Sequence, residues 1–242
     1  MWLFLDYDGT LVPIARTPEE ALPDVPLLDL LSGLADMPAL LVTVLSGRSL
    51  SSLQTLLPVP NLILAGIYGV EARLPGKGVI TRIDPARLRP TLEAVKSAWA
   101  QLIAGRDGFL LEDKRLALAL HARFARQADA DLVLAAAQAE AEKMASSDHF
   151  RVLVGERYLE VAPAAAHKGQ AIEWLLGQYA FPGARLVYFG DDDNDKEAFA
   201  VVRRRGGIAV AVGQPYGSIQ ARYHLPSIER VRACLQGWRA AV

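Results

Sequence analysis

The segment MWLFLDYDGTLVPI, residues 1–14, decides the fold class of this chain. Four apolar residues, Trp2–Leu5, run directly into Asp6 and Asp8, and Gly9 follows. An apolar run without polar alternation is typical of a strand that is buried on both faces, as in a parallel sheet. A turn at Asp8-Gly9 needs only one aspartate, so the second carboxylate at the end of a buried strand requires another explanation.

Apolar runs alternate with helical patterns through much of the remaining chain. Strands are predicted at Trp2–Asp6, Ala39–Leu45, Asn61–Ala65, Leu186–Phe189 and Ile208–Val212, and helices at Leu27–Leu34, Ser49–Leu57, Lys168–Tyr179 and Asn194–Arg205. This order predicts an α/β fold with a Rossmann-like parallel sheet. Ligands of such sheets bind at the carboxyl ends of the strands, which is where Asp6, Ser46 and Asp191 fall.

The middle of the chain follows a different pattern. Strands are predicted at Gly78–Ile83, Gly108–Asp113, Leu116–Arg123, Phe150–Val154 and Tyr158–Ala162, and helices at Ala86–Ala104 and Gln127–Met144. Leucines alternate with other residues in Leu116–Arg123, as in an antiparallel sheet with one covered face. We therefore expect residues 79–163 to form an α+β domain inserted into a core of residues 1–78 and 164–242.

Composition excludes several classes of function. The 242 residues carry a net charge of −1, so no basic field attracts nucleic acid or an anionic membrane. A single cysteine, Cys234, excludes an internal disulfide and a cysteine-rich zinc site. No secretory signal or membrane-span pattern is visible in the sequence. We expect a soluble cytoplasmic protein with no nucleic-acid or membrane partner; the sequence gives no oligomeric state.

Two short motifs have the chemistry to bind an anion. Ser46-Gly47 follows a predicted strand and offers a hydroxyl and a backbone N–H, although it equally fits a loop into a helix capped by Ser49. Lys168 lies in the first turn of a predicted helix, where the helix dipole opposes a cation. It is either a solvated surface lysine or a positive charge held for an anion.

A cluster of acidic residues marks another junction between strand and helix. Asp191, Asp192, Asp193 and Asp195 occupy four of five consecutive positions in GDDDNDKEAF. The helix dipole accounts for one or two of these acids. The repulsion among the other acids indicates that this cluster binds a hard cation. Mg²⁺ binds one or two carboxylates together with water and phosphate oxygens.

Taken together, these motifs resemble those of the haloacid dehalogenase (HAD) superfamily of phosphatases. The matching residues are Asp6-Tyr7-Asp8-Gly9-Thr10, Ser46, Lys168, and Gly190-Asp191-Asp192 with Asp195. The inserted domain resembles the type IIB cap of that superfamily in its position and mixed character.

Nearly the whole chain also resembles the trehalose-6-phosphate phosphatases. The similar stretches are LDYDGTLVPI, LSGR, AGIYGVEAR, EDKRLALALHAR, YLEVAPAAAHKG and GDDDNDKEAF. Four positions depart from the family: Tyr68 and Ala162 replace its usual His and Arg, and Asn194 and Lys196 replace Thr and Glu. These departures leave the chemistry intact and bear on the choice of sugar.

The resemblance implies a role for each residue of these motifs. Asp6 is expected to attack phosphorus and form an aspartyl-phosphate, and Asp8 to act as acid and then base, oriented by Thr10. The residues expected to bind phosphate are Thr10, Ser46, Gly47 and Lys168. The groups expected to hold Mg²⁺ are Asp6, the backbone carbonyl of Asp8, Asp191 and, in support, Asp195.

The resemblance also implies a sugar phosphate as substrate. The residues expected to bind sugar hydroxyls are Glu71, from a loop near the core, and Glu112, Lys114, Arg123 and Glu160 of the cap. For each, ion pairing on a solvated sheet face is the alternative. Three other functions stay open: a phosphatase for sucrose-phosphate or mannosyl-phosphoglycerate, a phosphomutase, and a non-catalytic regulatory domain, which the presence of every motif residue disfavours.

Overall fold

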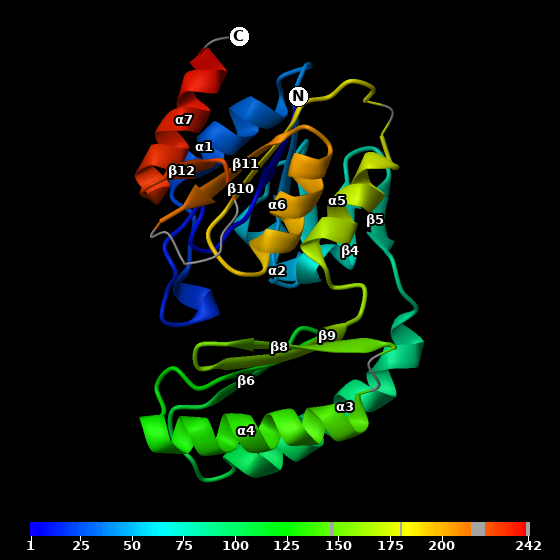
Figure 1. Ribbon diagram of the computed structural model, residues 1–242, viewed down its shortest axis with the longest axis vertical. Coiled ribbons are helices and arrows are strands. Elements are labelled where there is room, and N and C mark those ends of the chain that lie inside the picture. The colour runs from blue at the N-terminus through cyan, green and yellow to red at the C-terminus, as the bar shows by residue number, and fades with distance from the viewer. Residues whose placement is uncertain (146–147, 180, 214–220, 241–242) are drawn as a thin grey trace. The chain divides into compact units, whose positions relative to one another are not determined.

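The structure is a computed structural model that describes residues 1–145, 148–179, 181–213 and 221–240 (Figure 1). It divides into two compact units. The core unit comprises Met1–Ile80 and His167–Val242, and the inserted unit comprises Thr81–Ala166. The domain limits predicted from the sequence, after residues 78 and 163, lie close to these limits.

The core unit is built on one eight-stranded sheet in the order β12-β11-β10-β1-β2-β3-β4-β5. Its strands are β1 (Trp2–Leu5), β2 (Leu41–Leu45), β3 (Ile63–Gly66), β4 (Glu71–Leu74), β5 (Gly78–Thr81), β10 (Leu186–Gly190), β11 (Ile208–Val212) and β12 (Tyr223–Leu225). The pairs from β12 to β3 are parallel, and β4 runs antiparallel to β3. The predicted α/β fold with a parallel-rich sheet is confirmed.

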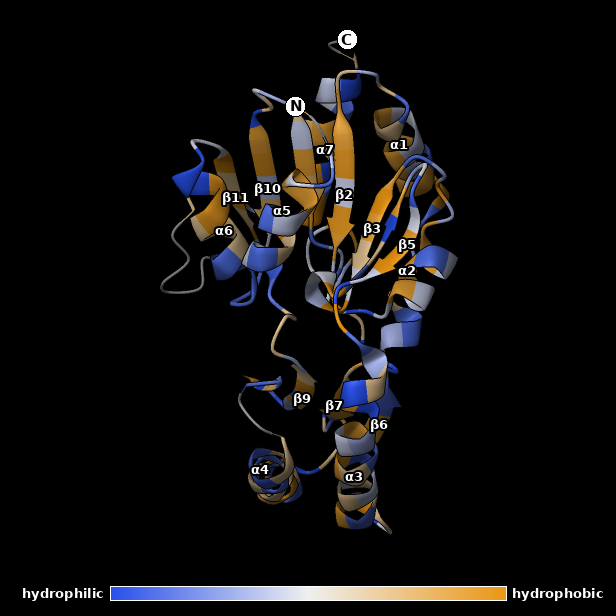
Figure 2. Ribbon diagram, turned by 90° about the vertical axis from the view of Figure 1, so that its right-hand side faces the viewer, coloured by the Kyte–Doolittle hydropathy of each residue, from blue (hydrophilic) through white to orange (hydrophobic). Residues whose placement is uncertain are grey.

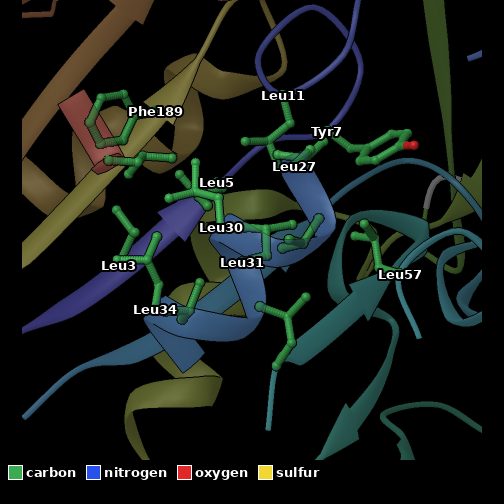
Figure 3. Close-up of a cluster of buried hydrophobic side chains, with 14 of the residues drawn as sticks. Leu3, Leu5, Tyr7, Leu11, Leu27, Leu30, Leu31, Leu34, Leu57 and Phe189 are labelled. Atoms are coloured by element: carbon green, nitrogen blue, oxygen red, sulfur yellow. The ribbon is translucent and has the colours of Figure 1, made fainter. Parts of the chain in front are cut away.

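Helices cover both faces of this sheet, which explains the uninterrupted apolar run of β1. Leu3 and Leu5 pack with α1 (Val25–Ala35), α7 (Ile228–Ala240) and Phe189 on one face (Figure 3). Trp2 and Phe4 face α5 (Lys168–Leu176) and α6 (Asp195–Arg204) on the other. β1 has no polar face because neither side of it meets water. Strands β2 and β10 are likewise mostly hydrophobic, as their orange colour in Figure 2 shows.

Short helical segments complete the core unit. They are α2 (Leu50–Leu56) and the 3₁₀ turns Pro18–Glu20 and Ile67–Gly69. The Ser49 hydroxyl accepts a hydrogen bond from the Ser52 N–H at 3.2 Å, so the predicted cap of α2 is confirmed. None of the helices in the described part of the chain has the length and apolar character that a membrane span requires.

The sequence-based assignment of the strand near residue 80 is wrong. It is predicted at Gly78–Ile83 as part of the inserted domain, but β5 hydrogen-bonds next to β4 in the core sheet. The error arises because no strand is predicted at 71–74, where Glu71 is expected in a loop. Since β4 is short and continues into β5 after only three residues, the two strands extend the edge of the core sheet.

The inserted unit contains a four-stranded antiparallel sheet in the order β6-β7-β9-β8. Its elements are α3 (Pro85–Ile103), β6 (Leu110–Asp113), β7 (Leu118–His121), α4 (Gln127–Met144), β8 (Phe150–Gly155) and β9 (Tyr158–Pro163). Leu118 and Leu120 share a buried cluster with Trp99 of α3 and Val133 of α4, so the helices cover one face of this sheet. The predicted strand Leu116–Arg123 is shorter than expected, and Arg123 lies in the exposed turn after it.

Candidate active site

Three neighbouring strands bring the sequence motifs to one edge of the core sheet. In register, Leu5 of β1 pairs with Val44 of β2 and with Phe189 of β10. The Asp6 N–H donates to the Phe189 carbonyl at 2.9 Å, which continues the ladder by one residue. Asp6, Ser46 and the acidic cluster therefore leave parallel strands at the same end, as predicted.

Lys168 connects two buried carboxylates. Its Nζ lies 2.9 Å from Asp6 Oδ1 and 2.6 Å from Asp195 Oδ1. Lys168 is 2% exposed at the first residue of α5, so the surface-lysine alternative is wrong. Because a buried ammonium at a helix N-terminus is unfavourable by itself, these two carboxylates are what stabilises it there.

Asp195 is a hub of hydrogen bonds at the start of α6. Its Oδ2 accepts the backbone N–H groups of Asp191, at 2.9 Å, and Asp192, at 3.1 Å. Its Oδ1 accepts from the Tyr188 hydroxyl as well as from Lys168. Tyr188 is not among the residues predicted from the sequence; the signal for it was a tyrosine within the apolar run LVYF, because a buried tyrosine hydroxyl usually has a partner.

Asp191 approaches the loop after β1 very closely. The Thr10 hydroxyl donates to Asp191 Oδ1 at 3.0 Å, so the described contact of Thr10 is with Asp191 and not with Asp8 as expected. Gly9 has φ 84°, and a Cβ on it would lie 2.0 Å from Asp191 Oδ2. Glycine is therefore required here both for its backbone conformation and for the space it leaves.

The three core carboxylates could hold a metal ion. Carboxylate oxygens of Asp6, Asp191 and Asp195 lie within 4.8 Å of one another. Burial raises the pKa of Asp6 well above its usual value, against the opposing charge of Lys168. Burial, followed by the charges of Asp195 and Asp192, raises the pKa of Asp191 to about 7. An all-oxygen set with uncompensated negative charge fits a hard divalent cation such as Mg²⁺.

The charge of Lys168 is secured by its partners. Burial alone lowers its pKa, but the Asp195 and Asp6 carboxylates reverse this effect and hold the pKa well above its usual range. Lys168 therefore remains an ammonium at neutral pH.

Asp8 is held by an arginine whose role was not predicted. Arg48 donates from Nε to Asp8 Oδ2 at 2.8 Å and from Nη2 to Asp8 Oδ1 at 2.7 Å. Its third nitrogen, Nη1, donates to the Pro18 carbonyl at 2.8 Å. The Arg48 backbone N–H donates to Ser46 Oγ at 3.2 Å, so the loop that carries Ser46 also orients Asp8. The only sequence signal was the position of Arg48 beside Ser46-Gly47.

Tyr68 packs against this same loop. A Cβ on Gly47 would lie 2.6 Å from the Tyr68 ring, and the Tyr68 N–H donates to the Ser46 carbonyl at 2.8 Å. Tyr68 has φ 54°, in the left-handed region. Glu71, predicted to lie in a loop, begins β4 opposite Gly66 and is buried.

In the inserted unit, three of the four predicted sugar-binding residues come together on one sheet face. Glu112 of β6 and Glu160 of β9 both pair in register with Ala119 of β7, so they point the same way. Lys114 Nζ lies 3.0 Å from Glu160 Oε1, and both side chains are buried. Solvated surface pairing is therefore wrong for Lys114 and Glu160. Arg123 lies outside this sheet, in the turn that follows β7.

Two aromatic side chains extend this polar group. His121 Nε2 lies 2.9 Å from Glu112 Oε2, and the Tyr158 hydroxyl donates to Glu160. The rings of His121 and Tyr158 lie 5.1 Å apart. Neither residue was among the predicted sugar-binding residues.

Comparison with known proteins identifies the family. The family model described as trehalose-phosphatase matches residues 4–227. The chain belongs to the trehalose-phosphatase family. It is thus a member of a family of phosphoric monoester hydrolases, and the resemblance noted in its sequence is confirmed.

Similar proteins of the trehalose-phosphatase family span most of this chain. It is 36% identical over 239 residues to a probable trehalose-phosphate phosphatase of Sinorhizobium fredii, covering 96% of this chain and 85% of the relative. It is 32% identical over 234 residues to the trehalose-6-phosphate phosphatase of Escherichia coli, covering 96% and 84%. The C-terminal domain of a Candida albicans trehalose-6-phosphate phosphatase has the same fold, with a TM-score of 0.85, 22% identity and coverage of 100% and 93%.

Proposed function

We propose that this chain hydrolyses trehalose 6-phosphate to trehalose and phosphate, with Mg²⁺ as cofactor and an aspartyl-phosphate intermediate on Asp6. The substrate is supported by family membership and by the two relatives named for it. The observation that carries the chemistry is the buried Asp6 carboxylate at a strand end, 2.9 Å from the Lys168 ammonium.

Asp6 would be the nucleophile. Lys168 contacts Asp6 Oδ1 and so fixes the orientation of the carboxylate before the substrate arrives. In the proposed step, a carboxylate oxygen of Asp6 forms a bond to phosphorus as the bond to the sugar oxygen breaks. Burial raises the pKa of Asp6, and the positive charge of Lys168 opposes this rise and so favours the ionised carboxylate that must attack.

Asp8 would carry the proton in both half-reactions. It would first protonate the departing sugar oxygen and then take a proton from the water that hydrolyses the aspartyl-phosphate. The two hydrogen bonds from Arg48 set its orientation. Thr10, Ser46 and Gly47 are proposed, with Lys168, to hold the phosphoryl oxygens.

Asp6, Asp191 and the backbone carbonyl of Asp8 would hold the metal ion. Bound there, Mg²⁺ supplies positive charge that offsets the repulsion between phosphate and carboxylates. Glu112, Lys114 and Glu160 of the inserted unit, with Glu71 and Arg123, are proposed to bind sugar hydroxyls, which would make that unit a substrate-specificity cap. The cytoplasmic location stays a prediction.

A phosphate-release screen over sugar phosphates tests this proposal. With Mg²⁺ present, we expect trehalose 6-phosphate to be hydrolysed in preference to sucrose phosphate, mannosyl-phosphoglycerate and glucose 6-phosphate. Exhaustive chelation should stop the release, and added Mg²⁺ should restore it. Preference for another sugar phosphate would contradict trehalose 6-phosphate as the substrate and leave the proposed phosphatase chemistry in place. No release from any ester would favour the regulatory alternative.

A further inference from the structure

Tyr188 is a fully buried tyrosine to which the proposed mechanism gives no role. It lies on β10, in the apolar layer that faces α5 and α6, and its ring stands edge-on to Phe199 with the centroids 5.5 Å apart. A phenylalanine would pack in the same place. Because burying a hydroxyl without a hydrogen bond is costly, the oxygen atom of Tyr188 needs a separate reason.

That reason is the Asp195 carboxylate. A carboxylate only accepts hydrogen bonds, so the Tyr188 hydroxyl is the donor to Asp195 Oδ1. The same oxygen receives the Lys168 ammonium at 2.6 Å, and Oδ2 receives the N–H groups of Asp191 and Asp192. A carboxylate has about four lone-pair positions. In the described part of the chain, four donors of the core unit fill them.

This saturation separates Asp195 from the other two core carboxylates. A metal ion could bind Asp195 only by displacing one of its four donors. Among the described residues, Asp6 and Asp191 are not enclosed in this way: Lys168 contacts Oδ1 of Asp6, and Thr10 contacts Oδ1 of Asp191. Asp195 is therefore better placed to orient Lys168 and the backbone of Asp191 than to coordinate a cation.

We propose that Tyr188 is a positioning residue for phosphoryl transfer: through Asp195 Oδ1 its hydroxyl fixes the Lys168 ammonium against Asp6, and Asp195 acts as an anchor and not as a metal ligand. The proposal deepens the proposed function and rests on it, since transfer to Asp6 is the step that a misplaced Lys168 would slow. The sugar plays no part in it.

The substitution Tyr188→Phe removes only the hydroxyl and keeps the contact with Phe199. We expect kcat for p-nitrophenyl phosphate at saturating Mg²⁺ to fall by about 10-fold to 100-fold, the range for one hydrogen bond to a charged group. The affinity of the resting protein for Mg²⁺, measured by titration calorimetry, should not change. The affinity of the Mg²⁺-loaded protein for inorganic phosphate, a measurement that needs no turnover, should weaken.

The matched control is Tyr179→Phe, because the Tyr179 hydroxyl donates to the Pro75 carbonyl in the same unit, away from this network. It should leave all three measurements at wild-type values. As a rescue, 4-aminophenylalanine at position 188 returns an N–H donor to the ring and should recover most of the lost kcat. If Tyr188→Phe folds poorly, the comparison between this analogue and wild type supplies the test.

Two results would overturn the proposal. One is a Tyr188→Phe protein that matches the Tyr179→Phe control in kcat and in phosphate affinity. The other is a loss that arises from weakened Mg²⁺ binding and disappears when Mg²⁺ is raised. If the expected pattern holds while the wild type releases no phosphate from trehalose 6-phosphate, the proposed substrate fails and the positioning role stands.

Discussion

The Arg48 guanidinium holds the Asp8 carboxylate with two hydrogen bonds, from Nε to Oδ2 at 2.8 Å and from Nη2 to Oδ1 at 2.7 Å. Arg48 also contacts the Pro18 carbonyl and, through its backbone, Ser46. One residue thus joins the proposed acid to the proposed phosphate loop. The fork of the guanidinium, and not its charge alone, sets the plane of the Asp8 carboxylate.

Replacing Arg48 by lysine should therefore damage catalysis although the charge is kept. Lysine cannot make the paired hydrogen bonds, so we expect kcat/KM to fall by about 10-fold or more. Steady-state kinetics with trehalose 6-phosphate and p-nitrophenyl phosphate check this, with the exposed Arg16→Lys as control. Wild-type rates for Arg48→Lys would show that the paired geometry is unimportant.

Gly9→Ala tests the close approach of Asp191. The new Cβ would lie 2.0 Å from Asp191 Oδ2, and alanine at φ 84° is also strained by about 1–2 kcal/mol. We expect activity and Mg²⁺ affinity to be lost. Gly76→Ala is the matched control, because Gly76 has φ 75° but nothing within 4 Å of the added atom. That control should lose some stability and keep full activity; equal activity loss in both variants would argue against the contact.

The raised pKa of Asp191, about 7, predicts a pH dependence of stability in the metal-free protein. The native state binds a proton at Asp191 that the unfolded state, with a pKa near 3.8, has released. Stability from this group therefore falls as pH rises from about 4 to about 7, by at most a few kcal/mol, since one pKa unit is about 1.4 kcal/mol.

Chelated wild type and Asp191→Asn can be compared by urea unfolding at pH 5 and pH 8. The amide does not ionise, so the variant should gain stability relative to wild type as the pH rises. A stability difference that is the same at both pH values would contradict the assignment of this pKa to Asp191.

Arg123→Ala separates sugar recognition from chemistry. Arg123 is exposed in a turn, so its removal should leave the melting temperature nearly unchanged. If it binds the sugar, kcat/KM should fall by about 10-fold to 100-fold for trehalose 6-phosphate and stay near wild type for p-nitrophenyl phosphate. Lys114→Ala is a poorer probe, because it removes the ammonium that pairs with the buried Glu160 carboxylate, and breaking a buried ion pair costs about 3–5 kcal/mol of stability. Equal losses on both substrates would remove Arg123 from sugar recognition.

The parts of the site that follow from chain direction were predictable from the sequence. Asp6, Ser46 and Asp191 each end an apolar run, and parallel neighbours must bring those ends together. The helical position of Lys168 left its burial undecided, and the fold adds Asp195 as a carboxylate partner that was not predicted. β4 escaped prediction because a strand of four residues carries little periodic signal.

Contacts that depend on side-chain direction between distant segments were not predictable. Arg48 and Asp8 are 40 residues apart, and no local pattern specifies their pairing. Tyr188 is only seven residues from Asp195, but their contact depends on the path of the loop between β10 and α6. The strand predicted at residues 78–83 was assigned to the wrong sheet because its neighbouring strand, β4, was not predicted.

The central claim is that Asp6 accepts the phosphoryl group of trehalose 6-phosphate. The direct measurement is a rapid acid quench during turnover, followed by mass spectrometry of the N-terminal peptide, on wild type and on Asp6→Asn. The account predicts a phosphorylated Asp6 in wild type, and neither phosphopeptide nor phosphate release from a folded Asp6→Asn protein, because the amide cannot form the acyl-phosphate. Sustained phosphate release by Asp6→Asn, or a phosphoryl group found on another residue, would contradict it.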